Sequence, residues 1–335
     1  MNFLVIGSAG YIGSILCKHL ISLGHSVKGL DNFSTGFRSL TKYGSHFKGD
    51  FSNESDLDKI LNNNDPFDCV FHLGGFSQVS ESVNFPEKYY KNNVAGTITL
   101  LSKITEYKIP YLIFSSSAAV YGNPNKLFID ENHDLNPINP YGRTKLMIEK
   151  IIEDYCLSYK LKSVALRYFN AAGADSECEL GECHEPETHL IPLILKAAFN
   201  SKEPMNIYGN DYETKDGTCI RDFIHVEDLV KAHYQAFDLL LNEGIDRFIS
   251  INLGSGSGHS IIEVINTAKK ILNDDEFSIS TQFSKRRTGD PDVLVANIAL
   301  ASKLMNWAPQ KSLREIIQHA WAWEKVRFFS QKNRL

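Results

Sequence analysis

Tyr141 and Lys145 are four residues apart in the segment N-P-Y-G-R-T-K, and a run of three serines ending at Ser117 closes an apolar stretch upstream. On a helix, side chains at this spacing leave the same face. A phenol titrates at about pH 10, so Tyr141 can accept the proton of an alcohol at neutral pH only if a fixed cation stabilises the phenolate. Lys145 is placed to be that cation, and a serine hydroxyl could share the proton. The three residues predict acid–base catalysis beside a nicotinamide ring, whose positive charge would favour the phenolate further.

The start of the chain predicts a dinucleotide site for that ring. The first six residues form an apolar strand-like run, and Gly7, Gly10 and Gly13 then turn the chain into a predicted helix. Glycines let the backbone approach a pyrophosphate, and the helix N-terminus offers free N–H groups to its oxygens. A second predicted strand, 25–30, ends at Asp31. An acid there binds the ribose 2'-hydroxyl and repels a 2'-phosphate, so the pattern predicts NAD rather than NADP.

Charge and hydropathy exclude several kinds of partner. The chain has 335 residues and a formal net charge of −5, with no global basic field. We therefore expect neither nucleic acid nor an anionic membrane as a partner. The chain begins without a basic and apolar leader pattern and contains no run of about 18 apolar residues, so we expect a cytoplasmic protein. Its length allows one large α/β domain and a smaller one.

Six cysteines are scattered along the chain, which favours reduced thiols over a disulfide framework. Cys178 and Cys183 are followed by His184 and His189, a spacing that zinc could use. The stretch is an acidic loop without a second cysteine pair. We therefore predict no metal site.

Apolar runs recur along the first half of the chain with helix-period segments between them, which predicts parallel βαβ units. The runs cover residues 45–48, 69–73, 111–115 and 163–169. Ligand loops form at the carboxyl ends of such strands, so the residues that follow these runs should meet in one crevice. A helix is predicted to begin at Pro140, because proline is well tolerated in a first helical turn.

The pattern predicts an α/β fold, a Rossmann-type doubly wound parallel sheet with a smaller C-terminal α/β substrate domain. The cofactor-binding domain should cover residues 1–174 and the substrate domain residues 175–335. A helix-like segment, 226–241, precedes an apolar run, 248–253, that should rejoin the first sheet. Residues of about 220–255 are therefore expected to return to the first domain, so that the two domains interleave.

Longer motifs extend over nearly the whole chain. They include G-S-A-G-Y-I-G-S, F-S-S-S-A-A-V-Y-G, Y-G-R-T-K, L-R-Y-F-N-A-A-G-A, I-Y-G-N-D-Y-E-T-K-D-G-T-C-I-R-D-F-I-H-V-E-D-L and R-R-T-G-D-P. On these motifs the chain resembles the extended short-chain dehydrogenase/reductases, and within them the UDP-glucose (UDP-galactose) 4-epimerase family. The stretch D-Y-E-T-K-D-G-T-C-I-R-D is typical of the 4-epimerases.

The resemblance implies an NAD-dependent interconversion of UDP-glucose and UDP-galactose. Tyr141 would take the proton of the sugar 4-hydroxyl while hydride passes from C4 to the nicotinamide, and Ser117 would hydrogen-bond the 4-oxygen. The 4-keto sugar would turn about its diphosphate link and receive the hydride on its opposite face, with no net redox change. NAD would stay tightly bound through turnover.

The resemblance also implies which residues hold the two ligands. The cofactor set is Gly7, Gly10, Tyr11, Ile12, Gly13, Asp31, Asn32, Ser34, Thr35, Gly36, Asp50, Phe51, Leu73, Gly74, Gly75, Ser77, Asn93, Ser115, Tyr141, Lys145 and Tyr168. The UDP-sugar set is Ser117, Tyr141, Asn170, His189, Leu190, Tyr208, Arg221, Arg287, Asp290 and Leu294. In the second set the two arginines suit diphosphate oxygens, because a planar guanidinium group pairs well with them.

Three positions depart from the pattern of many members. Ser77 stands where many have a lysine that faces the cofactor ribose, so that contact would be weaker or remade. His189 replaces an asparagine of some members, and its part in uridine binding stays open. Leu294 aligns with the residue proposed to gate the sugar pocket, where a tyrosine leaves little room beyond the 2-hydroxyl. With leucine there, we expect UDP-N-acetylglucosamine and UDP-N-acetylgalactosamine to be accepted as well.

Other chemistries remain as alternatives. Related dehydratases carry an Asp–Glu pair after the serine, and related decarboxylases a glutamate, whereas this chain has Ala118 and Ala119, which disfavours both. A 4-epimerase of UDP-uronates or UDP-pentoses stays open. A net dehydrogenase would release NADH. A catalytically silent NAD-binding regulatory protein is opposed by the presence of Tyr141, Lys145 and Ser117 together.

The family resemblance further implies a homodimer, formed through helices near 87–103 and 141–159, and a role in galactose metabolism. The sequence leaves open the preferred sugar, the resting redox state of bound NAD and the pathway served.

Overall fold

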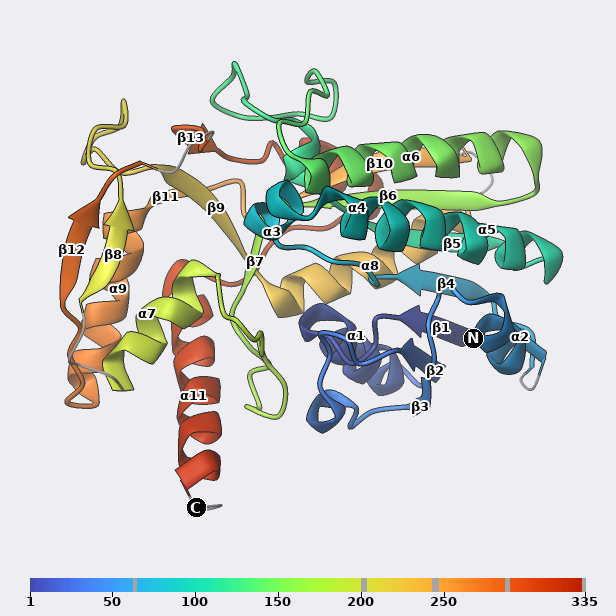
Figure 1. Cartoon of the computed structure of the whole chain (residues 1–335), viewed down its shortest axis with the longest axis horizontal. Helices are drawn as coiled ribbons and strands as arrows, with labels where there is room; N and C mark the ends of the chain where they lie inside the picture. Colours follow the sequence, from blue (N-terminus) through green and yellow to red (C-terminus); the bar gives the residue numbers. More distant parts are fainter. Residues whose placement is uncertain (63–64, 200–203, 243–246, 287–289, 333–335) are drawn as a thin grey trace.

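The computed structural model describes residues 1–62, 65–199, 204–242, 247–286 and 290–332. Its centre is a seven-stranded sheet of order β10-β6-β5-β4-β1-β2-β3, in which every neighbouring pair is parallel. The strands are β1 (Asn2–Ile6), β2 (Ser26–Asp31), β3 (Ser45–Lys48), β4 (Cys69–His72), β5 (Tyr111–Ser117), β6 (Lys162–Tyr168) and β10 (Phe248–Leu253). The strand order reverses between β1 and β4, so the predicted doubly wound α/β fold is confirmed (Figure 1).

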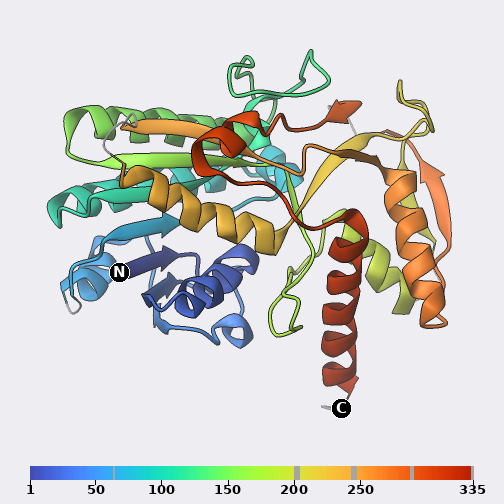
Figure 2. The same cartoon turned by 180° about the vertical axis from the view of Figure 1, so that it is seen from behind.

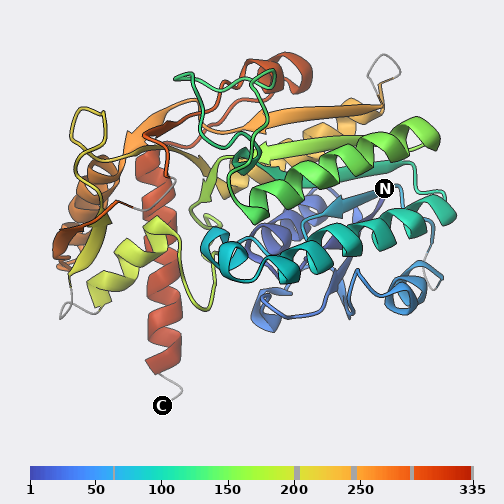
Figure 3. The same ribbon diagram turned by 45° about the horizontal axis from the view of Figure 1, so that its top comes forward.

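Helices cover both faces of this sheet, which explains why its central strands β1 and β4 are buried almost throughout. Successive residues of β1 face opposite cores: Phe3 and Val5 contact one core, and Leu4 and Ile6 the other. The first face is covered by α1 (Tyr11–Ser22), α8 (Val226–Leu240) and α10 (Ala299–Met305), and the second by α2 (Glu54–Asn62), α5 (Gly96–Glu106) and α6 (Pro140–Ser158). Figure 2 shows α8 and α1 in front of the sheet, and Figure 3 shows α5 and α6 side by side over its other face.

A smaller α/β region stands beyond the carboxyl ends of the strands (Figure 1). Its central strand, β9 (Ile220–His225), pairs with β7 (Asn170–Ala172), β11 (Gly258–Ser260) and β13 (Val293–Leu294). A separate parallel pair joins β8 (Met205–Tyr208) to β12 (Thr281–Ser284). The helices α7 (Leu190–Phe199), α9 (Ile261–Asp274) and α11 (Leu313–Lys332) share a third apolar core. Because β10 and α10 return to the large sheet from within this later part of the chain, the two regions are interleaved in sequence.

The remaining helical turns precede α5 or follow β5. They are Arg38–Leu40, α3 (Val79–Asn84), α4 (Pro86–Tyr89), a π-helical turn at Tyr90–Ala95, and Ala118–Val120. Within the described ranges, no helix is both long enough and apolar enough to cross a bilayer.

A buried ion pair fastens α6 to the sheet. Arg167 of β6 donates from Nη2 to Glu149 Oε2 at 2.6 Å and from Nε to Oε1 at 3.0 Å. Ser116 Oγ donates to the same Oε1 at 2.5 Å, and Arg167 Nη1 donates to the Tyr121 hydroxyl at 2.9 Å. Both charged side chains are at most 5% exposed. Since a buried charge is stable only when it is paired and hydrogen-bonded, this network makes the position of α6 depend on both residues.

Replacing Glu149 with alanine should therefore destabilise the protein strongly, because Arg167 would keep its charge in a buried site without a carboxylate. We expect the free energy of unfolding to fall by about 3–5 kcal/mol. Lys150→Ala, on the same helix, breaks the exposed contact with Glu153 and should change the free energy by less than about 1 kcal/mol. Urea unfolding followed by circular dichroism measures both, and equal effects would contradict the assignment.

Candidate active site

A single cleft of about 1540 Å³ opens where the carboxyl ends of the large sheet face α7, β8 and β9. Most predicted site residues line it: Gly7, Gly10, Tyr11, Ile12, Gly13, Asp31, Asn32, Ser34, Thr35, Gly36, Phe51, Leu73, Gly74, Gly75, Ser77, Ser115, Ser117, Tyr141, Lys145, Tyr168, Asn170, His189, Leu190, Tyr208, Arg221 and Asp290. The cleft thus brings the expected cofactor and substrate residues together at the point where the strand order reverses.

The glycine loop packs against neighbouring backbone at distances that leave no room for side chains. A Cβ on Gly7 would lie 2.8 Å from Gly74 N, and one on Gly13 would lie 2.1 Å from Gly7 O. Gly7 also has a φ of 81°, which favours glycine. No side chain caps the N-terminus of α1, so its first N–H groups are available to phosphate oxygens. The loop therefore fits the pyrophosphate of a dinucleotide.

Asp31 occupies the end of β2 as the sequence predicts. Its two carboxylate oxygens accept hydrogen bonds from Ala9 N at 2.9 Å and Phe33 N at 2.8 Å. Burial raises the pKa of Asp31, and these two backbone hydrogen bonds oppose the rise. Asn32 donates to Asp50 Oδ2 at 2.8 Å, which fixes the neighbouring amide. The carboxylate is thus held in the cleft wall, where ribose hydroxyl groups of NAD fit.

Tyr141 and Lys145 lie in the first two turns of α6. The Asn139 side chain accepts from Gly142 N at 2.8 Å, and Pro140 occupies the first turn, so the helix begins immediately before Tyr141. Lys145, 5% exposed, donates from Nζ to the Ser115 carbonyl oxygen at 2.6 Å. Its Nζ lies 5.8 Å from the centre of the Tyr141 ring.

The two side chains are shifted toward their neutral forms. Burial raises the pKa of Tyr141, and its hydrogen bond with Ser117 opposes the rise. Burial also lowers the pKa of Lys145 to about 7, and the charge of Glu149 opposes that shift. A phenolate on Tyr141 would supply the opposite charge that Lys145 lacks. The pair can therefore exchange a proton with a sugar hydroxyl once positive charge reaches the cleft.

Tyr168 is held in the cleft wall by a residue that the sequence did not indicate. Its hydroxyl is hydrogen-bonded to Nε2 of His233, a fully buried residue of α8. His233 Nδ1 lies 2.8 Å from the Leu229 carbonyl oxygen, which can only accept, so Nδ1 carries the proton and Nε2 accepts from Tyr168. Burial lowers the pKa of His233 to about 4, which keeps this ring neutral. The contact spans 65 positions, so no local pattern could have revealed it.

Residues that were predicted to contact UDP line the end of the cleft away from the glycine loop. Arg221, 8% exposed, forms an ion pair with Asp290, and its Nη1 donates to the Ile220 carbonyl oxygen at 2.8 Å. Asn170 and Tyr208 line the same cleft from β7 and β8. Arg287, which the resemblance placed here, lies outside the described residues. The positioned guanidinium suits a diphosphate oxygen.

Three other predicted residues contact residues of the cleft wall. Asp50 accepts from the Asn32 side chain. Asn93 accepts from Phe76 N at 2.9 Å and donates to Phe76 O at 3.0 Å, so it supports the loop that follows β4. Leu294 packs against a small apolar cluster that includes Ala118 and Phe169. Asp50 and Asn93 support cleft residues through these hydrogen bonds, and Leu294 packs beside the cleft residue Phe169.

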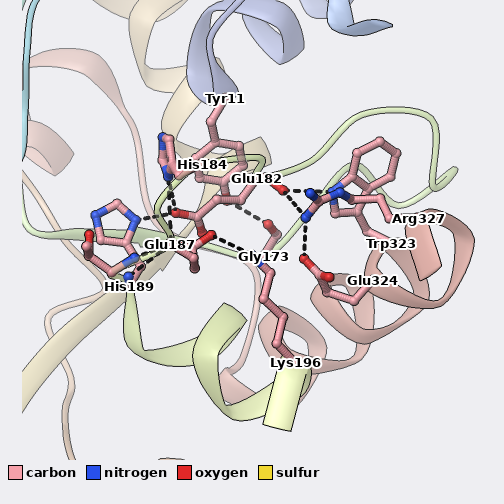
Figure 4. Close-up of polar contacts among 11 residues, drawn as sticks. Tyr11, Gly173, Glu182, His184, Glu187, His189, Lys196, Trp323, Glu324 and Arg327 are labelled. Atoms are coloured by element: carbon pink, nitrogen blue, oxygen red, sulfur yellow. Dashed lines mark hydrogen bonds and ion pairs between the residues drawn. The ribbon is translucent and has the colours of Figure 1, made fainter. Parts of the chain in front are cut away.

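Sequence reasoning noted the acidic loop with His184 and His189 but did not place Glu182, His184 and Glu187 in the cleft wall. Glu182, His184 and Glu187 line the cleft together with His189, and Figure 4 shows the four side chains converging beside Tyr11. Burial opposes protonation of His184, but hydrogen bonds to Glu182 and Glu187 outweigh it and raise the pKa to about 9. The spacing Glu-x-His-x-x-Glu-x-His was a visible signal that attention to the cysteines had overlooked.

The glycine loop, Asp31 and the Tyr141–Lys145 pair define an NAD-dependent enzyme of the Rossmann class. The sequence profile described as the NAD dependent epimerase/dehydratase family matches residues 3–254, and the chain belongs to this family. NAD is accordingly its cofactor.

Individual relatives agree along the whole chain. A UDP-glucose 4-epimerase of Rhizobium meliloti (strain 1021) is 44% identical over 326 residues, which cover 97% of this chain and 98% of that protein. The UDP-glucose 4-epimerase of Brucella ovis in complex with NAD is similar in structure, with a TM-score of 0.91, 43% identity and coverage of 96% and 97%. The UDP-Glc/GlcNAc 4-epimerase of Campylobacter jejuni has a TM-score of 0.82, 36% identity and coverage of 97% and 99%.

Proposed function

We propose that this chain is an isomerase that interconverts UDP-glucose and UDP-galactose by inverting C4 of the sugar. The observation that carries the proposal is the meeting, in one cleft, of Tyr141, Lys145 and Ser117 with a dinucleotide loop at one end and Arg221 at the other. Relatives with the same activity in their names match over nearly the full chain. When bound, NAD supplies the acceptor and later the donor of one hydride.

The side chains of the cleft bind the substrate and move its proton. Tyr141 removes the proton of the 4-hydroxyl, and Ser117, already hydrogen-bonded to Tyr141, holds the sugar 4-oxygen. Lys145 stabilises the phenolate from the same helix face. Arg221 holds the diphosphate, so the 4-keto sugar can turn while the nucleotide stays fixed. Tyr141 returns its proton to the 4-oxygen when C4 is reduced on the opposite face, and no redox equivalent leaves the protein.

Tyr141→Phe tests this assignment, because it removes the proton acceptor and keeps the ring. Anion-exchange chromatography of UDP-galactose incubated with the purified protein should show conversion to UDP-glucose without added cofactor. The variant should be slower by about 10²–10⁴-fold, with bound NAD still detected in the released nucleotide. Full activity of the variant would show that the motif is structural. If the unchanged protein converts neither UDP-galactose nor UDP-glucose, even with NAD supplied, a UDP-uronate or UDP-pentose substrate is favoured.

We further propose that the sugar pocket accepts 2-acetamido sugars. Leu294 lies opposite Arg221 in the pairing of β13 with β9 and packs beside Phe169, next to the cleft residues Tyr168 and Asn170. A leucine there occupies less space than the tyrosine that would narrow the pocket. The similar Campylobacter jejuni protein, named for both glucose and N-acetylglucosamine substrates, supports this assignment.

Leu294→Tyr should separate the two substrates. We expect turnover of UDP-N-acetylgalactosamine to fall by at least about tenfold, while UDP-galactose turnover changes less. A substrate group that does not fit its pocket raises the free energy of the transition state by about 1–3 kcal/mol. Leu294→Met, similar in volume, is the matched control and should retain both activities. Absence of UDP-N-acetylgalactosamine turnover by the unchanged protein would contradict the proposal directly.

We also propose a cytoplasmic homodimer that serves galactose metabolism. Large apolar side chains are exposed on the outer faces of α5 and α6: Ile98 is 41% exposed, Met147 46% and Leu157 72%. These two helices lie side by side on one surface of the molecule (Figure 3). A second copy would bury such side chains, which water otherwise surrounds.

Multi-angle light scattering should give a mass twice that of the 37.7 kDa chain. Met147→Glu should shift the protein to the monomer, because a self-complementary interface would bury two like charges. Leu23→Glu, equally exposed at the end of α1 on the other side of the sheet, should leave the dimer intact. A monomeric unchanged protein would overturn this proposal.

A further inference from the structure

The loop between β7 and α7 gathers four side chains that carry metal-ligand atoms. Glu182, His184, Glu187 and His189 each offer one such atom, and these atoms all lie within 4.8 Å of one another. Figure 4 shows the four groups turned toward a common point, with Nδ1 of both histidines directed at the Glu182 carboxylate. The His184 contact measures 3.1 Å.

The two carboxylates at this point are withdrawn from water. The side chains of Glu182 and Glu187 are each 4% exposed, whereas those of His184 and His189 are 25% and 50% exposed. Glu187 Oε2 is buried and has no hydrogen-bond partner among the described residues, although Lys196 Nζ lies 3.5 Å away. The two protonated histidines can supply positive charge to these carboxylates, but no described group hydrogen-bonds to Oε2 of Glu187. A metal ion in place of the two histidine protons would supply the charge and a partner for a carboxylate oxygen.

The chemistry and spacing of the donors match a transition metal better than calcium or magnesium. Two imidazole nitrogens and two carboxylate oxygens form a donor set typical of Zn²⁺, which prefers four ligands. Calcium and magnesium prefer oxygen ligands alone. The four residues fall within eight consecutive positions, so one loop conformation places all of them.

The loop is anchored from behind by α11. The Glu182 carbonyl oxygen accepts from Trp323 Nε1 at 2.9 Å and from Arg327 Nη1 at 3.5 Å (Figure 4). A Cβ on Gly181 would lie 2.5 Å from the Trp323 ring, so the chain approaches that ring as closely as glycine permits. These contacts fix the backbone of the first ligand before any ion arrives, as pre-organised metal sites require.

We propose that Glu182, His184, Glu187 and His189 bind one divalent transition-metal ion, with Zn²⁺ the best match. The ion would neutralise the two buried carboxylates and join the loop to the start of α7 in the wall of the cleft. This revises the sequence prediction of no metal, which weighed the histidines with Cys178 and Cys183. Cys183 instead packs against the apolar core. The inference does not depend on which sugar the enzyme converts.

The test measures metal binding by the purified protein with its cofactor. The protein is treated with a chelator, exchanged into metal-free buffer and titrated with ZnCl₂ by isothermal calorimetry, and bound zinc is counted by mass spectrometry after dialysis. We expect one Zn²⁺ per chain. His184→Gln and Glu182→Gln should each weaken binding by at least about tenfold, because each removes a ligand.

His319→Gln is the matched control. His319 belongs to the other described group of histidine and glutamate side chains, with His225 and Glu227, so it reports binding at a second place. The control should bind zinc as the unchanged protein does. Co²⁺ gives an independent readout, since a four-coordinate site produces a visible absorption band that His184→Gln should remove.

Two results would overturn the proposal. One is the absence of stoichiometric zinc binding, which would mean that the four residues form a closed ion-pair network. The other is unchanged binding in His184→Gln together with its loss in His319→Gln. Far-ultraviolet circular dichroism checks that each variant is folded. If Glu182→Gln fails to fold, Glu187→Gln removes a different ligand and carries the same expectation.

Discussion

The active site depends on a buried lysine that has no carboxylate of its own. Lys145 is 5% exposed and bonds to the Ser115 carbonyl at 2.6 Å, so its ammonium group is short of opposite charge. Glu149, one turn further along α6, could have supplied that charge, but Arg167 holds both of its carboxylate oxygens. The lysine is therefore left to stabilise an anion that forms in the cleft. A phenolate on Tyr141, one turn earlier on the same helix face, is the nearest group that can become one.

The structure around Lys145 fixes the position of Lys145 relative to Tyr141. The Arg167–Glu149 pair ties the middle of α6 to β6, and the Asn139 cap with Pro140 sets where the helix begins. Tyr141 N also donates to Ser82 Oγ of α3 at 3.2 Å, so α3 holds the first turn of α6 in addition to the sheet. Each support acts on backbone or on a buried group. Tyr141 and Lys145 thus lie on a helix and Ser117 at a strand end rather than on a loop, which limits the movement of these side chains.

The sequence was informative wherever a short pattern determines local geometry. Gly7 and Gly13, Asp31 and Tyr141 with Lys145 all lie where strand–turn–helix patterns placed them. Partners brought together by tertiary packing were invisible: His233 reaches Tyr168 across 65 positions, and Arg167 reaches Glu149 across 18. The Glu182 loop shows an intermediate case. Its spacing was readable, but burial of the two carboxylates, which gives the spacing its meaning, exists only in the fold. Resemblance alone pointed to Asn93 and Leu294, because their partners, the Phe76 backbone and the cluster around Phe169, are brought to them only by the fold.

Burial moves the pKa of Tyr141 upward and that of Lys145 downward to about 7, so in the protein alone Tyr141 stays neutral and Lys145 is charged less readily than a lysine in water. Proton abstraction from a sugar hydroxyl needs the opposite arrangement, a phenolate beside an ammonium. Burial causes both pKa shifts, so a change in the electrostatic potential of the cleft alters the pKa values of both side chains. Bound NAD would supply positive charge beside Tyr141 in its oxidised form and would lose that charge on reduction. A phenolate on Tyr141 would in turn stabilise the ammonium group of Lys145. Tyr141 and Lys145 are therefore expected to gain and lose their charges together, because each is placed to stabilise the charge of the other.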